Sequence, residues 1–387
     1  MPSTVSLTPK GADRIYGGHP WIYRSDLRDV RAKGGDIVRV VDPRGRTLGE
    51  ALYSDRSQIA LRMLTRGETS ATADWWRARL EQAVRFRESL GIDATAYRLV
   101  HGEADLLPSL IVDRYGDVIV VQTLSQGIDR RMAELTQMLV DLVAPSGILA
   151  RNDPRVRQLE GLEQKVELLH GHVPERVPVV ENGIRYDVDV WKGQKTGLFL
   201  DQRENREAAA RYGSGRALDA FSYNGGFALT LARRCERVIA IDVSEDATSH
   251  IRHNALLNGA ANVEARTANV FDELRELDRA GERFDIVVLD PPAFAKTKAA
   301  LPKAVSGYKE INLRALKLLK PGGFLVSCTC SYHVDEAMFV DIVHEAALDA
   351  GVPVTVVEKR MQGRDHPVLL GVPETCYLKC LVLRRLV

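Results

Sequence analysis

The segment Ile286–Phe294, with the sequence IVVLDPPAF, constrains the fold more than any other part of the chain. Its run of four apolar residues, three of them β-branched, is typical of a strand that is buried on both faces of a parallel sheet. The two prolines that follow cannot continue a hydrogen-bonded ladder, so this strand is expected to end at Asp290. Because open α/β sheets bind ligands at the carboxyl ends of their strands, Asp290 is a candidate binding residue. A strand that ends in an ordinary proline turn is the structural alternative.

Strand and helix patterns alternate from Arg216 to His333. The strand patterns are RALDAF, RVIAID, NVEART, RFDIVVL and GGFLVSC, and a helix pattern separates each from the next. Such alternation predicts right-handed βαβ units, and therefore an α/β domain with a doubly wound parallel sheet. The segments VPVTVVEKRM and TCYLKCLVLRRL are expected to add an antiparallel pair at the edge of this sheet.

Two smaller domains are expected before this sheet. Short β-branched runs separated by Gly, Pro and Asp predict a small β-barrel first. A helix from Thr72 to Leu90, which Asp74 can cap, begins a small α+β domain. That domain continues with a hairpin that turns at Asp113–Asp117 and a helix from about Ile128 to Val143. Prolines at 174 and 178 indicate a linker, so the expected domains are 1–70, 71–178 and 179–387.

Polar residues at the ends of the strands indicate a nucleoside cofactor. Asp219 ends the first strand, and Gly225 lies in the turn that leads into a helix, where free amides are available. Asp242 ends the second strand, where an acid can accept from ribose hydroxyls, and Asn269 ends the third, where it can contact adenine. Neither G-x-G-x-x-G nor a P-loop is present, which favours S-adenosylmethionine over NAD or ATP. The expected cofactor residues are Asp219, Phe221, Ser222, Asn224, Gly225, Asp242, Val243, Asn269 and Val270, with the two valines bracketing the adenine ring.

The motifs DAFSYNGGF, IDVS, VLDPPAF and SCTCS resemble, in order and spacing, a Rossmann-like class I S-adenosylmethionine-dependent methyltransferase. The start of the chain, with HPWI, GDIVRVVD and GEALY, resembles a PUA domain, an RNA-binding barrel. With KTGLFLDQRENR, nearly the whole chain resembles the bacterial 23S ribosomal RNA cytosine-5 methyltransferases, most specifically in residues 192–331. This resemblance implies a cofactor site lined by Gln202, Asp219, Phe221, Asp242, Asn269 and Asp290, although the family usually has an acid in place of Asn269. The neighbouring Asp201 is expected to lie over the cofactor, to cap the next helix, or both.

Cytosine C5 needs activation before it can accept a methyl group, and addition of a thiolate at C6 provides it. Cys330 ends the strand pattern GGFLVSCTC, one strand away from Asp290, and is the expected nucleophile. Asp290 can hydrogen-bond the N3/N4 edge of the base. Pro291 and Pro292 are expected to form a rigid wall, and Phe294 or Tyr308 is expected to stack on the base after it leaves its helix.

Two features leave this assignment open. Cys328 shares a pleat face with Cys330, although only Thr329-Cys330-Ser331 matches the T/S-C-S pattern of the family. Either thiol can instead be core filler. Many RNA cytosine-5 methyltransferases also have a second cysteine after the two prolines, where this chain has Ala293. Another base must then remove the C5 proton, and the candidates are Lys296 and Lys309.

The segment GGHPWIYRSDL supplies the expected RNA contacts, because it places Trp21 and Tyr23 beside Arg24. Aromatic rings can stack on bases and arginines can bind phosphates. The alternative is that Trp21 and Tyr23 belong to the core of the barrel. Residues 1–70 contain 12 Lys and Arg against 8 Asp and Glu, a net charge of +4 that is compatible with RNA binding.

Composition sets further bounds. No apolar run approaches the ~18 residues of a membrane span, and the amino terminus lacks the apolar core of a secretory signal. The five cysteines form neither a C-x-x-C pair nor a zinc-ligand set, so reduced thiols, no metal and a cytoplasmic location are expected. Ribosomal RNA is the expected partner, and a homodimer is a candidate assembly.

Two other functions remain open at this point. Asp-Pro-Pro with an aromatic residue is similar to the [DN]PP[YFW] motif of N6-adenine and N2-guanine methyltransferases, which need no thiol, although here the aromatic residue comes one position later. A non-catalytic RNA-binding or ribosome-assembly factor that keeps the fold is the third reading. A variant that lacks Cys330 and a test of labelled-methyl transfer distinguish the three.

Overall fold

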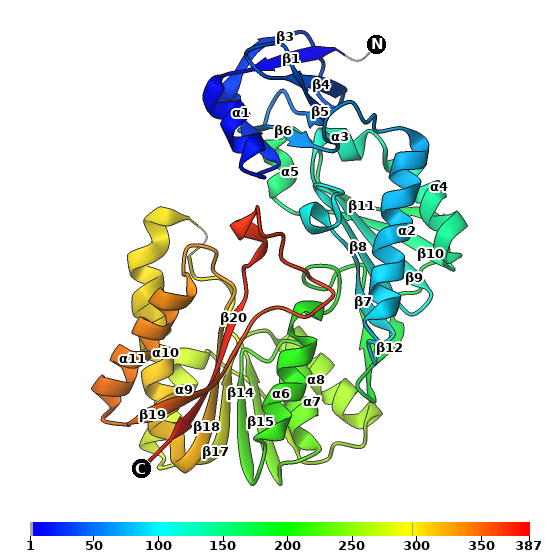
Figure 1. Cartoon of the computed structure of the whole chain (residues 1–387). Helices are drawn as coiled ribbons and strands as arrows, with labels where there is room; N and C mark the ends of the chain where they lie inside the picture. The colour runs from blue at the N-terminus through cyan, green and yellow to red at the C-terminus, as the bar shows by residue number, and fades with distance from the viewer. Residues whose placement is uncertain (1–2, 296) are drawn as a thin grey trace. The chain divides into compact units, whose positions relative to one another are not determined.

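The computed structural model describes residues 3–295 and 297–387, and the chain forms two compact units (Figure 1). Unit 1 consists of Met1–Val180, Asp187–Leu200 and Arg364–Thr375, and unit 2 consists of Glu181–Tyr186, Asp201–Gly363 and Cys376–Val387. Within the described ranges, no helix is both long enough and apolar enough to cross a membrane.

Unit 1 begins with a six-stranded sheet that surrounds a small apolar core. The strand order is β2-β6-β5-β4-β1-β3, and alternate residues such as Val5, Leu7 and Ile22 are buried in the core. This confirms the expected small β domain. The element bounds are β1 Thr4–Leu7, α1 Pro9–Tyr16, β2 Trp21–Tyr23, β3 Leu27–Val30, β4 Ile37–Val41, β5 Thr47–Tyr53 and β6 Ile59–Met63.

The second part of unit 1 is a five-stranded sheet in the order β11-β10-β9-β8-β7, packed against helices. The predicted hairpin is present, because Tyr115 pairs with Val118. The first helix has the predicted extent, but its cap is Thr72 and not Asp74, since the Thr72 side chain accepts from the Trp75 amide. The second predicted helix is broken into α3 and α4. The bounds are α2 Ala73–Ser89, β7 Ala96–His101, β8 Leu110–Tyr115, β9 Val118–Thr123, α3 Gln126–Asp129, α4 Met132–Val143, β10 Gly147–Asn152, α5 Val156–Leu159 and β11 Lys165–Gly171.

Charged side chains join parts of unit 1 that are distant in the sequence. Arg62 of β6 forms a buried ion pair of 2.8 Å with Glu160, which follows α5. The segment 364–375 also belongs to this unit: the buried Asp365 accepts from the Arg98 amide at 2.8 Å and, through its carbonyl, from Arg87 at 2.9 Å. Residues near the carboxyl terminus therefore complete the core of the amino-terminal unit.

The expected proline linker is in part a strand. Residues Val177–Glu181 form β12 and pair with β13, Ile184–Val188, in a separate two-stranded sheet. Pro178 has no amide to donate, but a strand in a two-stranded sheet needs partners on one side only, so the proline is tolerated there.

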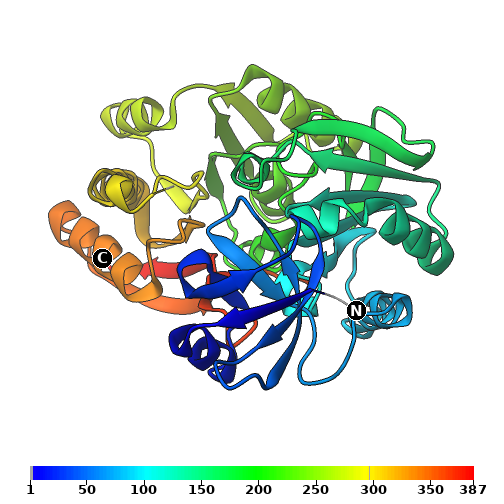
Figure 2. The ribbon, with the colours of Figure 1, turned by 90° about the horizontal axis from the view of Figure 1, so that it is seen from above.

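Unit 2 is the predicted α/β domain, and its seven-stranded sheet has the order β16-β15-β14-β17-β18-β20-β19. The first five strands in this order are mutually parallel, and β20 pairs antiparallel with both β18 and β19, which confirms the expected closing pair. In Figures 1 and 2, β20 (red) lies within the sheet and near α11 (orange). The strand bounds are β14 Arg216–Ala220, β15 Arg237–Asp242, β16 Val263–Thr267, β17 Phe284–Leu289, β18 Leu319–Thr329, β19 Val354–Arg360 and β20 Lys379–Arg385.

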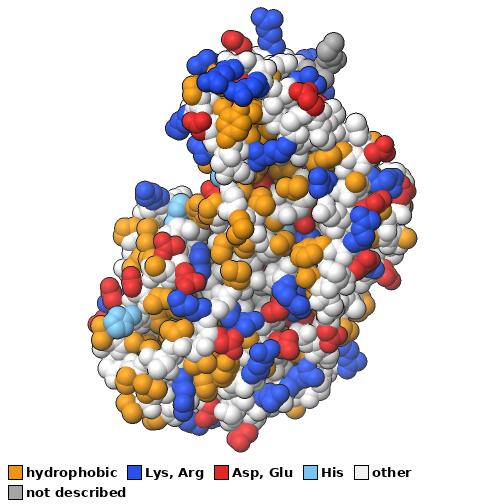
Figure 3. Space-filling view, in the orientation of Figure 1, with side chains coloured by type: hydrophobic (Ala, Val, Ile, Leu, Met, Phe, Trp, Pro, Cys, Tyr) orange, Lys and Arg blue, Asp and Glu red, His pale blue; other side chains and the backbone are white. Residues whose placement is uncertain are grey.

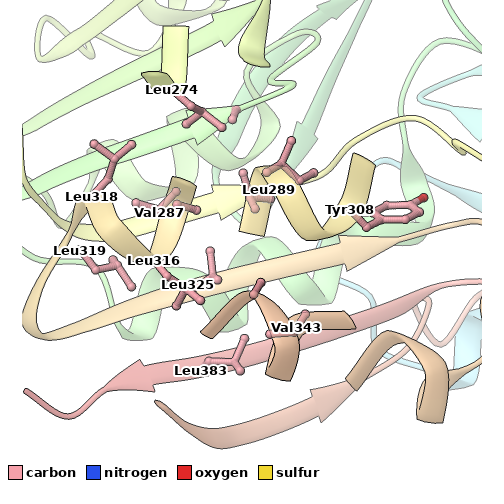
Figure 4. Close-up of a cluster of buried hydrophobic side chains, with 14 of the residues drawn as sticks. Leu274, Val287, Leu289, Tyr308, Leu316, Leu318, Leu319, Leu325, Val343 and Leu383 are labelled. Atoms are coloured by element: carbon pink, nitrogen blue, oxygen red, sulfur yellow. The ribbon is translucent and has the colours of Figure 1, made fainter. Parts of the chain in front are cut away.

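Helices cover both faces of this sheet, as the continuous apolar run in β17 requires. On one face, Val287 and Leu289 of β17 pack with Leu325 of β18 and with Leu316 and Val343 of the covering helices (Figure 4). On the other face, Ile286 and Val288 pack in a second core. The helices of the first face are α9 Val270–Arg279, α10 Leu301–Leu318 and α11 Glu336–Ala350, and those of the second are α6 Arg203–Arg211, α7 Gly226–Ala232 and α8 Glu245–Leu257.

A buried ion pair fixes α6 in unit 2. The guanidinium of Arg206 donates twice to the carboxylate of Glu181, at 2.8 and 2.7 Å, and both side chains are almost fully buried. The Cα of Gly226 faces this guanidinium so closely that an added Cβ would lie 2.9 Å from its Cδ. The pair therefore determines how α6 packs beside α7.

We expect Arg206→Ala to destabilise the protein by about 3–5 kcal/mol, because the variant leaves a buried carboxylate without its counter-ion. Urea unfolding followed by circular dichroism measures this loss. The control is Arg279→Ala, which removes an exposed ion pair with Glu276 and should cost less than about 1 kcal/mol. Equal losses in the two variants would contradict a special role for the buried pair.

Candidate active site

Three acids lie at one edge of the parallel sheet of unit 2. In the register, Ala220 of β14 is paired with Ile241 of β15 on one side and with Leu289 of β17 on the other. Asp242, the last residue of β15, and Asp290, the residue after β17, therefore lie at the same level on either side of β14, and Asp219 lies one residue before the end of β14. The sequence prediction that these acids share the carboxyl edge agrees with this geometry.

The turn between β14 and α7 has an unusual backbone. Phe221 and Tyr223 adopt left-handed φ values of +67° and +51°, and Gly225 follows at +87°. Side chains other than glycine rarely adopt this region, and such strain concentrates at functional sites. The turn is tied to β15, because the Tyr223 amide donates to Asp242 at 2.9 Å. Sequence reasoning missed Tyr223, since no residue pattern indicates a left-handed tyrosine.

Asp219 is the most perturbed acid of the site. Its side chain is 1% exposed, and its Oδ2 accepts from the Ala228 amide at 2.8 Å. Its Oδ1 accepts no hydrogen bond from the part of the chain that the structure describes. Burial, together with the nearby carboxylates of Asp290 and Asp242, raises the pKa of Asp219 to about 7. An orphaned oxygen of this kind is a binding group for a donor or cation that the protein itself does not supply.

Gln202 and Asp290 are brought together. Gln202 Nε2 donates to Asp290 Oδ1 at 2.8 Å, and Gln202 Oε1 accepts from Asn205 at 2.7 Å. These two bonds fix the amide of Gln202 and the orientation of the Asp290 carboxylate. Asp201 does not cap α6; its Oδ2 accepts from the Tyr377 hydroxyl at 2.7 Å. The role of Asn205 was not predicted, because it lies inside α6 without a motif of its own.

The remaining candidate cofactor residues divide into two groups. Asp242 is half-buried and accepts from the Tyr223 amide of the β14–α7 turn and from the Ser244 amide of its own turn, and the next residue, Val243, is 71% exposed. By contrast, Val270 is 3% exposed and packs in the core. The two valines therefore do not form two equivalent sides of an adenine pocket. Asn269 caps α9 by accepting from the Phe271 amide at 2.9 Å. The other turn residues contribute mainly backbone: the Ser222 hydroxyl donates to the Asp219 carbonyl, the Asn224 carbonyl accepts from Asn254, and Gly225 precedes α7.

Aromatic rings gather after Asp290. Pro291 is buried and Pro292 is exposed. Phe294 is half-buried, and its ring centroid lies 4.6 Å from that of Tyr308. Tyr308 itself is fully buried and bonds through its hydroxyl with Ser331 and Thr329. The structure thus places Tyr308 as the support of Phe294, whereas we had predicted either ring as a stacking surface.

The two neighbouring cysteines differ in accessibility. Cys328 is fully buried in β18 opposite Cys380, and the hydrogen bond between these thiols, together with burial, raises the pKa of Cys328 well above its ordinary value. Cys330 is half-buried and comes directly after the last residue of β18. Since Leu289 is paired with Ser327, Asp290 is level with Cys328 and Cys330 follows two residues further along the edge. Only the second thiol is accessible at the carboxyl edge of the sheet.

The sequence offered Lys296 and Lys309 as acceptors of the C5 proton. Lys309 forms ion pairs with Glu345 and Asp349, which raise the pKa of its ammonium and make it a poor base. Lys296 lies outside the described residues. The described ranges contain no cluster of metal-ligating side chains.

The predicted RNA contacts lie in unit 1 and have structural partners. Trp21 is half-buried and donates from Nε1 to Glu103 at 3.0 Å. Arg24 donates to the carbonyls of Ser54 and Ser57 at 2.9 and 2.7 Å. Tyr23 is half-buried and packs under the guanidinium of Arg14. These contacts support the fold of the barrel, the alternative that the sequence had left open.

Comparison with known families identifies this chain. Residues 97–384 match the family model of S-adenosylmethionine-dependent methyltransferases, and residues 5–66 match that of PUA-like domains. The chain therefore belongs to the S-adenosylmethionine-dependent methyltransferases and carries a PUA-like domain at its amino terminus.

The names of similar proteins narrow the class of methyltransferase. The chain is 41% identical to the ribosomal RNA large subunit methyltransferase I of Tolumonas auensis, over 99% of this chain and all of the relative. It is 40% identical to the protein of the same name from Aeromonas salmonicida, over 95% of each chain. A solved methyltransferase structure in complex with SAH has the same fold, with a TM-score of 0.86 over 99% of this chain and 100% of that one, at 19% identity.

The residues at the sheet edge fit S-adenosylmethionine. The cofactor brings a cationic sulfonium and an ammonium group, and the orphaned oxygen of Asp219 is suited to a cation or a donor. The left-handed turn of Phe221, Tyr223 and Gly225 also presents backbone to a ligand, as the site requires.

We expect the affinity for S-adenosylmethionine to rise as the pH is raised from 5.5 through 7. Asp219 has a pKa of about 7, so it is mostly neutral at the lower pH, and a cationic ligand favours the carboxylate that forms at the higher pH. The gain should approach, at most, about tenfold per pH unit below pH 7 and should level off above it. Isothermal titration calorimetry between pH 5.5 and 7.5 measures it.

Asp219→Asn should weaken binding and remove this pH dependence. Asp341→Asn, an exposed acid on α11, is the control and should keep the profile of the unmodified protein. A pH-dependent affinity that persists in Asp219→Asn would assign the titration to another group.

Proposed function

We propose that this protein transfers a methyl group from S-adenosylmethionine to C5 of a cytosine in 23S ribosomal RNA through a covalent adduct on Cys330. One observation carries the proposal: an accessible thiol follows β18 at the same sheet edge where Asp290 follows β17, while Cys328 is buried. The names of the relatives support the choice of RNA, since they are large-subunit ribosomal RNA methyltransferases.

The chemistry requires a nucleophile and a group that holds the base. The Cys330 thiolate forms a bond to C6, which moves electron density to C5 and the N3 side of the ring. Asp290, oriented by Gln202, accepts from the N4 amino group, and a proton shared between its carboxyl group and N3 stabilises this charge. S-adenosylmethionine supplies the electrophilic methyl group that C5 attacks. A base then takes the C5 proton, which restores the C5–C6 double bond and expels the thiolate.

The same residues account for how base and cofactor are held. A base inside an RNA helix is inaccessible, so the target must turn out of its stack to reach Asp290. Phe294, supported from beneath by Tyr308, offers the ring surface, and Pro291 and Pro292 keep the segment rigid. The proposed cofactor contacts come from Gln202, Asp219, Phe221, Ser222, Asn224, Gly225, Asp242, Val243, Asn269 and Val270.

The PUA-like domain is proposed to bind the ribosomal RNA, in the cytoplasm. Figure 3 shows Lys and Arg side chains gathered over this part of unit 1. Arg28, Arg31, Lys33 and Arg44 are exposed there. Because Trp21 and Arg24 already have partners within the unit, these exposed cations are better candidates for phosphate contacts.

The decisive test is to methylate unmodified 23S RNA and to map the product by mass spectrometry. We expect 5-methylcytosine, and we expect Cys330→Ala to lower turnover by roughly three orders of magnitude or more, because the variant lacks the nucleophile. Cys328→Ala is the matched control on the same strand and should retain methyl transfer.

Other results would lead to the competing functions. Full turnover of Cys330→Ala with a methyl group on an exocyclic amine would indicate an amino methyltransferase. Absence of transfer by protein that binds the cofactor would indicate an RNA-binding factor.

A second test concerns the RNA contact. Replacing Arg28 and Arg31 with alanine should weaken RNA binding equally for different sequences and reduce the slope of log K against log salt by about 1 to 2, since each phosphate contact contributes ~0.7–0.9. Fluorescence anisotropy at several salt concentrations measures the slope. The control is the double substitution Arg279→Ala and Arg283→Ala, at the end of α9 that leads into β17 and so at the opposite sheet edge from Asp290.

A further inference from the structure

Lys379 is a buried basic side chain beside the end of β18. It is the first residue of β20, lies opposite Thr329 in the antiparallel pair β18–β20, and is 8% exposed. Its ammonium donates to the carbonyls of Ser331 and Tyr377 at 3.4 and 3.3 Å. The first of these carbonyls belongs to the residue that follows Cys330.

Lys379 has no hydrogen-bonded carboxylate among the described residues. Its two hydrogen-bond partners are neutral carbonyls at long distances, and it forms no ion pair with the described residues. Other lysines of unit 2 behave differently: Lys320 pairs with Asp285 and Lys359 pairs with Glu336, each at 2.8 Å. A buried ammonium without an anion is costly, so its surroundings call for a negative partner.

The ionisable groups around Lys379 supply such a partner. They are the thiols of Cys376 and Cys330 and the carboxylate of Asp335, and each favours the charged ammonium, whereas burial lowers the pKa of Lys379. Asp335 is exposed, and its Oδ1 accepts from the Met338 amide at 2.8 Å to cap α11. Each thiol directly precedes a residue whose carbonyl the ammonium contacts, Cys330 before Ser331 and Cys376 before Tyr377. Of the two, Cys330 is the one that follows β18 at the sheet edge where Asp290 follows β17.

We infer that Lys379 is a positioning residue that holds Cys330 as a thiolate by acting as its buried counter-ion. The inference rests on the proposed function and gives the nucleophile of that reaction its activating group. A neighbouring lysine lowers the pKa of a cysteine in this way, and the thiolate is the reactive form. No sequence motif marks Lys379, which is distant from Cys330 in the chain and reaches it only through the β18–β20 pairing.

The proton balance of this step is simple. The S–H bond of Cys330 breaks and an N–H bond forms on the neutral amine of Lys379, which gives a thiolate and an ammonium with no change in total charge. The thiolate then forms its bond to C6, and the ammonium remains. When the C5 proton is lost and the C6–S bond breaks, the thiolate returns to the same counter-ion. The ammonium has no free electron pair, so it is not the acceptor of the C5 proton.

The test measures the ionisation of Cys330 without turnover. The full-length protein is alkylated with iodoacetamide at pH 5.5 to 9.5, and the rate at Cys330 is read from its peptide by mass spectrometry, separately from that at Cys376. We expect a midpoint near pH 7 for the unmodified protein, below the ~8.5 of a free thiol. A midpoint at or above 8.5 in the unmodified protein overturns the inference, whatever the variants do.

Three variants identify the cause. Lys379→Met should move the midpoint upward and slow alkylation of Cys330 at pH 7 by about tenfold or more, whereas Lys379→Arg keeps the positive charge and should restore much of the rate. Lys359→Met, an exposed lysine on the neighbouring strand β19, should leave the profile unchanged. Circular dichroism and cofactor affinity establish that each variant is folded.

The same variants separate this inference from the proposed function. If Cys330→Ala is inactive but Lys379→Met leaves the alkylation profile unchanged, the cysteine mechanism stands and the role of Lys379 is wrong. A rise of KM for RNA in Lys379→Met, with kcat and the thiol profile unchanged, would make Lys379 an RNA contact and would also overturn the inference. A lower kcat with its pH midpoint displaced upward, and KM unchanged, supports it.

Discussion

The pairing of β17 with β14 on one side and β18 on the other is the interaction on which the site depends. Parallel strands in register bring their carboxyl ends to one line, so Asp219, Asp290 and Cys330 come to the same edge of the sheet although they are far apart in the sequence. The apolar run of β17 is buried by helices on both faces, and this burial holds the register, since slippage by one residue would exchange the two faces of the strand. The chemistry at the edge therefore follows from packing within the sheet.

Charge is distributed unevenly at this edge. Carboxylates lie at the ends of β14, β15 and β17, and burial together with repulsion from its neighbours raises the pKa of Asp219 to about 7. Beyond β18 the sheet continues with the antiparallel β20, whose first residue, Lys379, is the only cation that we have assigned to the edge. The parallel half of the sheet thus provides a region that attracts a cation, and the antiparallel addition provides a region that favours an anion.

Local patterns were sufficient to predict the order of strands and helices, the hairpin at Tyr115 and the antiparallel closing pair, because each depends on residues close in sequence. Contacts between distant segments were not predictable. Thr72 and Asp74 are both good cap residues, and only the backbone decided between them. The burial of Tyr308 depends on Ser331 and Thr329 from another element, and the partnership of Gln202 with Asp290 came only from a family resemblance. A lysine at the start of the last strand carries no signal at all.

The segment 364–375 has a consequence for biosynthesis. It inserts Asp365 among Arg87 and Arg98 of unit 1, while the residues before and after it belong to unit 2. During translation, the amino-terminal unit therefore lacks part of its interior until residues 364–375 have been made. Neither unit is a contiguous stretch that can be excised at one cleavage point. The first unit can accordingly close only after most of the second has been synthesised.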